Sequence, residues 1–225
     1  MNSVHSFSQL ATDRRSVRAY LPTPVSEDLL RDVLVQARLA PSGANLQPGS
    51  FVQVRGVVRE GLSADLVDAW QHGREEAEDY SYFPKPMPHT LRRRQVAAAQ
   101  ALYGALGVAR DDRAGRSAQF ERNFKFFDAP VALIVTMPHD MGSGCYMDLG
   151  MTLYGLMLAA HAKGLSTCAI GAMASFPNLI RQRLGLEASS HIVCGMAIGY
   201  ADPDAPVNQT QTERCALDEY FKVVG

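Results

Sequence analysis

YMDLGMTLYGLMLAAHAK, residues 146–163, is the stretch from which the rest of the architecture can be worked out. Its spacing predicts a helix whose side chains, after Asp148, are apolar or small on every face until His161. Such a helix is buried in a large core, a subunit interface or a membrane, but this run is shorter than the roughly 18–20 residues of a membrane span. We therefore expect protein to enclose it, partly from a second subunit. An ordinary core helix in a monomer is the alternative.

Composition narrows the class of protein further. The chain has 225 residues, of which 47% are hydrophobic and 20% charged, enough for a substantial core in one large or two small domains. The formal net charge of −1 gives no reason to expect nucleic acid or an anionic membrane as a partner. Residues 1–15 lack the apolar run of an export signal. We therefore expect a cytoplasmic protein that crosses no membrane.

Several chemistries are excluded because their motifs are missing. The four cysteines are widely spaced, and no two form a C-x-x-C pair, which argues against a zinc ribbon or a dithiol redox site. The sequence has no phosphate loop, no dinucleotide fingerprint, no H-E-x-x-H and no G-x-S-x-G. We therefore expect no bound metal and no nucleophilic catalytic triad.

The pattern of apolar residues predicts an α+β fold, because helices outnumber strands and the connections between strands are uneven. The expected helices are about 7–13, 26–39, 62–70, 89–108, 146–163 and 178–184. The expected strands are 51–58, 131–137, 166–170 and 191–198. The charge run 110–116 is expected to form a solvated turn. Region 61–122 as a whole is expected to be a lid or pocket wall, a common role for long loop-bearing insertions.

Three arginines and a serine lie close together after the first predicted helix, in the stretch DRRSVR. In an extended backbone, alternate side chains point the same way, so Arg14, Ser16 and Arg18 would share one face. Two guanidinium groups and a hydroxyl on one side suit a phosphate dianion. A solvated basic surface is the alternative interpretation.

A shaped loop follows the second predicted helix. The stretch APSGANLQP, residues 40–48, has two prolines, a glycine and the polar side chains of Ser42, Asn45 and Gln47. Their hydroxyl and amide groups could recognise a heterocycle, although the loop could also simply cap the preceding helix. With the basic cluster and a Gly171-Ala172 turn after a strand, this loop predicts a nucleotide-type cofactor bound without a Rossmann fingerprint.

At this point the sequence resembles the nitroreductase-like flavoproteins. The motifs RRSVR and APSGANLQP are followed in order by RNFKFFDAPV, MDLGMTLYGLMLAAHAKGLSTC and GYADPDAPVN, so that the resemblance runs from about Asp13 to the C-terminus. It implies a single FMN-binding domain over residues 1–225, with a central, mainly antiparallel sheet flanked by helices. It also implies an intertwined homodimer with a long interface helix, a swapped C-terminal tail and FMN sites at the interface.

The resemblance also assigns candidate contacts. The first segment, 14–18, would hold the FMN phosphate and the N1/O2 edge of the ring, while segment 42–45 would come from the partner subunit. Residues 123 and 125 would face the pyrimidine edge, and which of the two matters is left open. Segment 169–172 would face the ring's N5, with the backbone N–H of Gly171 as donor. The implied cofactor-binding residues are Arg14, Arg15, Ser16, Arg18, Ser42, Gly43, Asn45, Asn123, Lys125, Ala169, Ile170, Gly171, Ala172 and Arg214.

The implied activity is a ping-pong oxidoreduction in which NADH or NADPH reduces FMN and a flat nitroaromatic or quinone-like acceptor reoxidises it. No side chain needs to act as a catalyst, because the flavin N5 carries the chemistry. Aromatic residues of region 61–122 are candidate pocket walls, with ordinary packing as the alternative: Trp70, Tyr80, Tyr82 and Phe83. Other functions for the same fold are dehalogenation, enone reduction, flavin fragmentation, or FMN binding without catalysis. The sequence does not choose between NADH and NADPH, between one- and two-electron transfer, or among acceptors.

The chain departs from the family pattern at three places. Gly49 stands where Trp is frequent, and Ala169 and Gly171 stand where Pro and an acidic or amide residue are common. The tail has fewer basic residues, with Gln209 and Gln211 in the region concerned. A backbone contact to N5 survives a change of side chain, whereas fewer tail charges would weaken phosphate binding.

Overall fold

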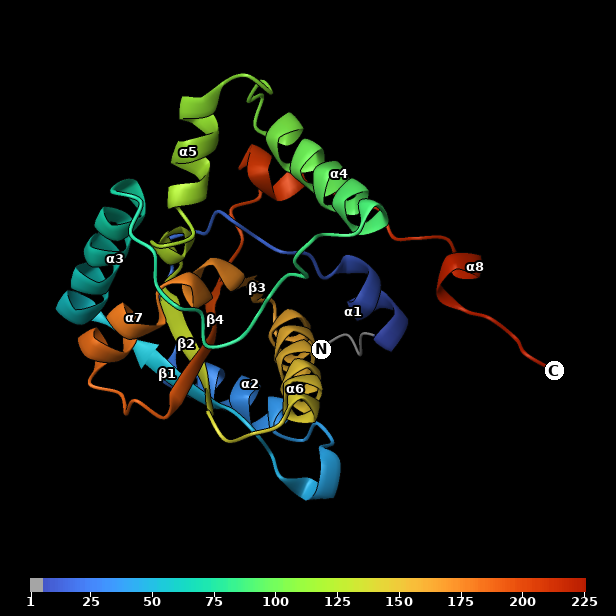
Figure 1. Ribbon diagram of the computed structural model, residues 1–225, viewed down its shortest axis with the longest axis horizontal. Coiled ribbons are helices and arrows are strands. Elements are labelled where there is room, and N and C mark those ends of the chain that lie inside the picture. Colours follow the sequence, from blue (N-terminus) through green and yellow to red (C-terminus); the bar gives the residue numbers. More distant parts are fainter. Residues whose placement is uncertain (1–5) are drawn as a thin grey trace.

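The computed structural model describes residues 6–225 and has the α+β architecture that the sequence predicts (Figure 1). Four strands form one sheet in the order β1-β2-β4-β3, and every neighbouring pair is antiparallel. Helices cover both faces of this sheet. Residues 1–5, part of the stretch in which no export signal is found, lie outside the described residues.

The two central strands are long and buried on both faces. The strands are β1 (Ser50–Val54), β2 (Val131–Pro138), β3 (Ser166–Ile170) and β4 (Ser190–Gly199). Along β2, Leu133 and Val135 face one layer of the core, while Ala132 and Ile134 face the other. This alternation is the period of two that a strand imposes. It explains why β2 and β4 read as continuous apolar runs.

The first strand is shorter than the sequence predicts, because helix α3 (Gly56–Gln71) begins much earlier than expected. Gly56 adopts φ +52°, a left-handed conformation that favours glycine, and it turns the chain out of the sheet. Val57 and Val58 therefore lie in the first turn of a helix, where both are exposed. The β-branched side chains of Val57 and Val58 favour a strand, but the turn at Gly56 ends the strand before them.

One face of the sheet packs against α2 (Glu27–Ala37) and α6 (Ser143–Ala162). Helix α2 begins as predicted, because the Ser26 hydroxyl accepts a hydrogen bond from the backbone N–H of Leu29. Leu30 and Val33 of α2 and Leu149 and Leu156 of α6 are buried together in this layer. Helix α6 is the apolar helix of residues 146–163, and it starts three residues earlier than that stretch.

The opposite face is covered by α3, by α7 (Pro177–Leu184) and by a phenylalanine-rich turn that precedes β2. Leu62 and Leu66 of α3 pack there with Phe124 and Phe126, all at most 1% exposed. Helix α7 ends at Gly185, which caps it in the left-handed conformation. The predicted helix 178–184 is thereby confirmed.

Region 61–122 contains most of α3, an irregular aromatic loop, and the helices α4 (His89–Ala105) and α5 (Arg113–Glu121). The prediction of a turn over 110–116 is wrong in its second half. Asp112 caps α5 there by accepting a hydrogen bond from the backbone N–H of Gly115 at 2.8 Å. Helices α4 and α5 stand away from the sheet, beside the tail segment, in Figure 1.

The short elements complete the chain. They are α1 (Phe7–Asp13), η1 (Gly43–Asn45), η2 (Phe126–Asp128), η3 (Gly171–Ser175), η4 (Pro206–Gln209) and α8 (Leu217–Tyr220). After η4 the tail runs away from the body of the molecule (Figure 1). Its apolar side chains Leu217, Tyr220, Phe221, Val223 and Val224 are 60–95% exposed.

Within one chain, α6 is enclosed on one side only. Its outer face presents Met147, Met151 and Tyr154, which are 68%, 36% and 41% exposed. These residues are spaced by four and three positions, so they form one stripe along the helix. An apolar stripe of this kind is typical of an interface. Among the described residues, no helix is both long enough and apolar enough to cross a bilayer.

Candidate functional site

The basic segment after α1 lies along the outer edge of strand β3. The backbone N–H of Val17 donates to the carbonyl of Thr167 at 3.1 Å, and Ser16 pairs with Thr167 as a parallel bridge. This extended backbone brings the predicted residues of segment 14–18 together. They line a pocket of about 350 Å³ with the tail residues Thr210, Gln211, Thr212 and Arg214.

One arginine of this pocket has an unused donor. The Nε of Arg14 is buried and has no hydrogen-bond partner within residues 6–225. A buried donor without a partner is costly, so the site suits an acceptor that the protein itself does not supply. Four guanidinium groups with one acid, Asp13, line the pocket, and the missing acceptor is therefore expected to be an anion.

The predicted loop 42–47 is held in an unusual backbone conformation. Ala44, Asn45 and Gln47 have φ values of 49°, 57° and 51°. Left-handed conformations cost roughly 1–3 kcal/mol each in residues other than glycine, and they persist only where the surroundings hold them. The backbone N–H of Gly43 donates to the Asp148 carboxylate at 3.0 Å, and that of Gln47 donates to the Ser42 hydroxyl at 2.9 Å.

A single chain does not bring this loop to the basic pocket. Asp148 holds the loop near the start of α6, whereas His161 near its end lines a second pocket, of about 340 Å³, with Arg14 and Arg15. Thirteen residues of α-helix separate Asp148 from His161, which corresponds to about 20 Å along the axis. The two groups of predicted residues are therefore at opposite ends of α6.

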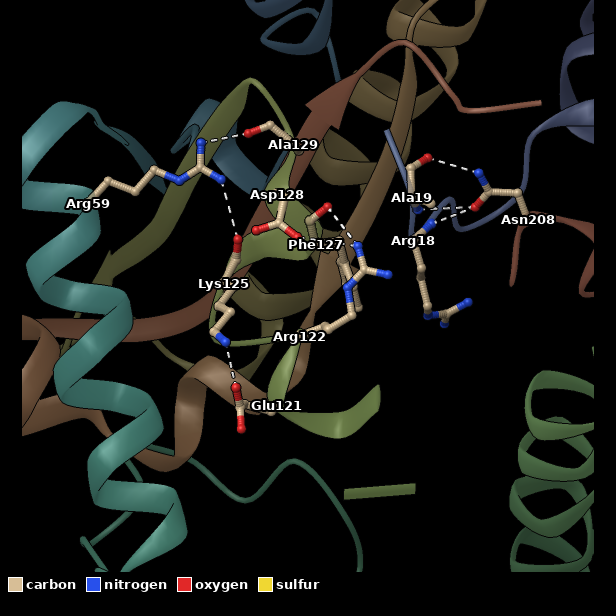
Figure 2. A network of polar contacts seen from close by, with 10 residues as sticks. All are labelled: Arg18, Ala19, Arg59, Glu121, Arg122, Lys125, Phe127, Asp128, Ala129 and Asn208. Atoms are coloured by element: carbon tan, nitrogen blue, oxygen red, sulfur yellow. Dashed lines mark hydrogen bonds and ion pairs between the residues drawn. The ribbon is translucent and has the colours of Figure 1, made fainter. Parts of the chain in front are cut away.

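A second strained turn directly follows the predicted contacts near residue 125. Phe126, Phe127 and Asp128 have φ values of 53°, 53° and 59°. Arg59 of α3 holds the turn by donating to the carbonyls of Ala129 at 2.6 Å and Lys125 at 3.3 Å (Figure 2). Among residues 6–225, every left-handed residue other than glycine lies in one of these two turns. The first turn contains predicted cofactor contacts, and the second directly follows the predicted contacts Asn123 and Lys125. Backbone strain gathers at such sites.

The side chains of Asn123 and Lys125 are engaged by their own neighbours. Asn123 donates to the carbonyl of Phe120 at 2.7 Å, and Lys125 pairs with Glu121 at 2.5 Å. Which of the two faces a ligand therefore stays open. Burial lowers the pKa of Arg59, while the Asp128 carboxylate raises it. Sequence reasoning missed Arg59, because its partners are about seventy positions away and are backbone carbonyls.

The end of β3 is open on one side. Ala169 is exposed although its neighbours Cys168 and Ile170 are buried. Gly171 follows, and a Cβ at this position would lie 3.0 Å from the ring of Tyr82. The glycine that departs from the family pattern thus lets an aromatic side chain lie closer than a larger residue would allow.

The aromatic loop that carries Tyr82 is anchored at its start. The Tyr80 hydroxyl donates to the carbonyl of Val193 at 2.7 Å, and burial raises the pKa of Tyr80. The rings of Tyr80 and Tyr82 lie 6.0 Å apart, and those of Tyr82 and Phe83 lie 4.8 Å apart. Trp70 instead packs against Phe120 and Phe124, so ordinary packing accounts for it.

The departure from the family pattern at Gly49 has a local cause. Gly49 adopts φ +101°, and a Cβ there would lie 2.5 Å from Leu149 of α6. Neither the backbone conformation nor the available space accommodates a large side chain at this position.

Together these features define a class of protein. Ser16 of the basic pocket pairs with Thr167 of β3, and Gly171, against which the Tyr82 ring lies, comes four residues further along, about 13 Å for an extended chain. An elongated ligand with an anionic end and a flat ring fits this distance. The fold and site are those of an α+β protein that binds a ring-bearing phosphorylated cofactor.

The chain belongs to the nitroreductase family. The model of that family matches residues 11–200, which include the sheet, α6 and most of the predicted contacts. This finding confirms the resemblance seen in the sequence.

Individual relatives match over nearly their whole length. The chain is 39% identical to a 4-nitrobenzoate reductase of Pseudomonas putida, over 97% of this chain and 96% of the relative. It is 35% identical to a chloronitrobenzene nitroreductase of Comamonas testosteroni, over 96% of this chain and 95% of that relative. Among solved structures, the FMN- and NADPH-dependent nitroreductase NfnB from Sphigopyxis sp. strain HMH superposes with a TM-score of 0.94 at 36% identity, covering 98% of this chain and 100% of that one.

Proposed function

We propose that this protein is an FMN-dependent oxidoreductase that uses NAD(P)H to reduce nitroaromatic compounds. The observation that carries the proposal is the basic pocket, in which the buried Nε of Arg14 lacks an acceptor. A phosphate monoester would supply that acceptor. Relatives named as nitrobenzoate, chloronitrobenzene and nitrobenzene reductases, at 34–39% identity, support the same activity.

The residues have distinct roles in this proposal. Arg14, Arg15, Ser16, Arg18 and Arg214 hold the phosphate and the polar edge of the ring. The cationic side chains also favour the negative charge that a reduced flavin carries. Asn123 or Lys125 would lie at the pyrimidine edge. The backbone of segment 169–172 faces N5, with the N–H of Gly171 as the donor.

Bound FMN supplies the hydride chemistry, and the protein supplies binding, orientation and electrostatics. The flat acceptor lies beside the aromatic loop, with Tyr82 and Phe83 as walls. The half-buried Tyr82 hydroxyl stays protonated under ordinary conditions, because burial raises its pKa. It can therefore donate a hydrogen bond to an oxygen of the acceptor. Nitro groups and quinones both present such oxygens, so quinone-like acceptors belong to the proposal.

We further propose that the active form is a homodimer whose FMN sites contain residues of both chains. The stripe of Met147, Met151 and Tyr154 on α6 would be covered by the partner. Segment 42–45 would then reach the partner's cofactor, since it lies about 20 Å from the basic pocket of its own chain, by the helical rise of α6. The exposed apolar tail would cover part of the partner's surface.

The whole chain forms one FMN-binding domain in this proposal, and region 61–122 supplies its lid. The part after Tyr80, which includes α4 and α5, would be the movable portion, because α3 is fixed in the core by Leu62 and Leu66. The cytoplasm is the proposed location, because the reaction consumes NAD(P)H.

The decisive experiment is an anaerobic visible spectrum of the purified protein reconstituted with FMN. Addition of NADPH or NADH should bleach the flavin bands, and 4-nitrobenzoate, nitrobenzene or benzoquinone should restore them. The faster donor identifies the physiological nicotinamide. Flavin that neither nucleotide bleaches would support FMN binding without catalysis. A protein that takes up no FMN would contradict the proposal.

A further inference from the structure

We propose that Asn208 is a positioning residue for the basic pocket. Its side-chain amide fixes the backbone that carries Arg18 against the segment that leads to Arg214. The inference rests on the proposed function for the identity of the ligand, but the contacts themselves do not depend on it. Asn208 lies in η4, 190 positions after Arg18, and it is 8% exposed.

The amide of Asn208 makes four hydrogen bonds, and Figure 2 shows those to Arg18 and Ala19. Its Oδ1 accepts from the backbone N–H groups of Arg18 at 2.9 Å and Ala19 at 3.2 Å. Its Nδ2 donates to the carbonyls of Ala19 and Asp202, both at 2.8 Å. An asparagine amide has two acceptor positions and two N–H donors. All of them are used here, so the orientation of the side chain is fixed.

These hydrogen bonds take the place of those that a neighbouring strand would make with the backbone of Arg18 and Ala19. Val17 pairs with Thr167 of β3, and the backbone N–H of Leu21 donates to the carbonyl of Tyr200 at 2.9 Å. Between these two points, the amides of Arg18 and Ala19 both face the Asn208 carbonyl oxygen. The side chain therefore completes the path of the backbone that presents Arg18 to the pocket.

The same residue sets the opposite wall of the pocket. Two residues after Asn208 the chain reaches Thr210, and from there to Arg214 it lines the pocket that Arg18 also lines. The two walls come from opposite ends of the sequence, and the Asn208 amide joins them. Its effect on a bound anion acts through these neighbours, because its own polar atoms are all engaged.

No other common side chain makes this set of bonds. Aspartate has the same shape but no N–H, so it would place a carboxylate oxygen against the carbonyls of Ala19 and Asp202. Alanine would leave the half-buried N–H groups of Arg18 and Ala19 without acceptors. Both changes should disturb the pocket more than they disturb the flavin-ring end of the site.

The test compares FMN with riboflavin, which lacks the phosphate. Apo-protein is titrated with each flavin, and binding is followed by fluorescence quenching. Asn208→Asp should weaken FMN binding by about 10-fold or more, the loss expected when charge-assisted hydrogen bonds are misplaced. It should weaken riboflavin binding by a smaller factor, because only the contacts of Arg18 to the ring edge are then affected. Asn178→Asp, the same change in α7, should leave both affinities unchanged. Equal losses for both flavins, or no loss for either, would overturn the proposal.

A measurement on the unaltered protein covers the case in which the variant does not fold. Hydrogen exchange of the apo-protein should show the amides of Arg18 and Ala19 protected, because both donate to Asn208. If the amides of Arg18 and Ala19 exchange fast while the amide of Val17 is protected, the positioning role is refuted. If the unaltered protein takes up no FMN while these amides are protected, the proposed function fails and the structural role of Asn208 does not.

Discussion

The buried carboxylate of Asp148 accepts a hydrogen bond from the backbone N–H of Gly43 at 3.0 Å. This contact joins the long central helix to the loop in which three residues adopt left-handed conformations. Asp148 is 5% exposed, so the bond is shielded from water. The carboxylate therefore helps to hold a strained loop in one conformation.

Removing this carboxylate should weaken cofactor binding. Asp148→Ala loses a hydrogen bond to a charged group, worth about 1.5–3 kcal/mol, and we expect a roughly 10- to 150-fold weaker affinity for FMN. Asp148→Asn keeps an acceptor oxygen and should lose less. Isothermal titration of apo-protein with FMN measures both variants. An alanine variant that folds and binds FMN normally would show that the loop does not need this anchor.

Mixed dimers can test whether the loop serves the partner's site. A chain with Asp148→Ala and a chain with Arg14→Gln are unfolded together and refolded. If the loop acts in the partner's site, half of the sites in each mixed dimer combine an intact loop with an intact basic pocket, and FMN binding recovers in part. If the loop acts in its own chain, every site is impaired and no recovery occurs.

Arg14→Lys should reduce FMN affinity although the charge is kept. Lysine is a point charge without the Nε–H group that lacks a partner in the structure. We expect roughly a 10-fold loss for FMN, as for a lost charge-assisted hydrogen bond, and a smaller loss for riboflavin. Arg31→Lys, an exposed change on α2, serves as the control. An unaltered FMN affinity would show that Arg14 acts only through its charge.

Gly171→Ala should displace Tyr82, because the new Cβ would lie 3.0 Å from the ring. We expect slower reduction of the nitroaromatic acceptor by the pre-reduced enzyme. The added methyl group should matter much less in a Tyr82→Ala background, where the ring is gone. Stopped-flow rates of the two single variants and the double variant give the coupling between the residues. Strictly additive effects would mean that the two positions do not interact.

Met151→Glu should shift the protein toward monomers. Met151 lies in the middle of the exposed stripe on α6, where a charge buried at an interface has no counter-ion. Sedimentation velocity should show a dimer for the unaltered protein and a concentration-dependent monomer for the variant. Val57→Glu, on the exposed first turn of α3, should leave the dimer intact. A monomeric unaltered protein would contradict the dimer proposal directly.

Cys194 should make the protein less stable at alkaline pH. Burial raises the pKa of its thiol to about 12, whereas in the unfolded chain a thiol titrates near 8.5. Between these values the unfolded state loses its proton first, so the stabilising contribution is complete below pH ~8.5 and falls as pH rises toward 12. Urea unfolding from pH 8 to 10.5 should show a shallower decline for Cys194→Ala than for the unaltered protein. Parallel declines would exclude this residue as a cause.

Much of the fold could be predicted because its signals are local. The Ser26 cap, the apolar face of α2, the terminating Gly185 and the runs of β2 and β4 each depend on neighbouring residues. The predictions failed where a single residue overrides its surroundings. Gly56 ends β1 early, and Asp112 starts a helix inside a charge run.

The candidate site was predictable in part for a different reason. Alternation placed Arg14, Ser16 and Arg18 on one face, and all three line one pocket. The supporting contacts of Arg59, Asp148 and Asn208 join backbone groups distant in the sequence. No spacing rule reveals such partners, because a backbone N–H or carbonyl occurs at almost every position.

The basic segment also has a consequence for solubility. Strand β3 is at the edge of the sheet, and the pairing of Ser16 and Val17 with Thr167 occupies part of that edge. An uncovered edge strand is a template on which another chain can add a strand and begin to aggregate. Detachment of this segment would thus open the sheet to its neighbours, so the contacts that hold residues 16–19 in place also protect the protein from aggregation.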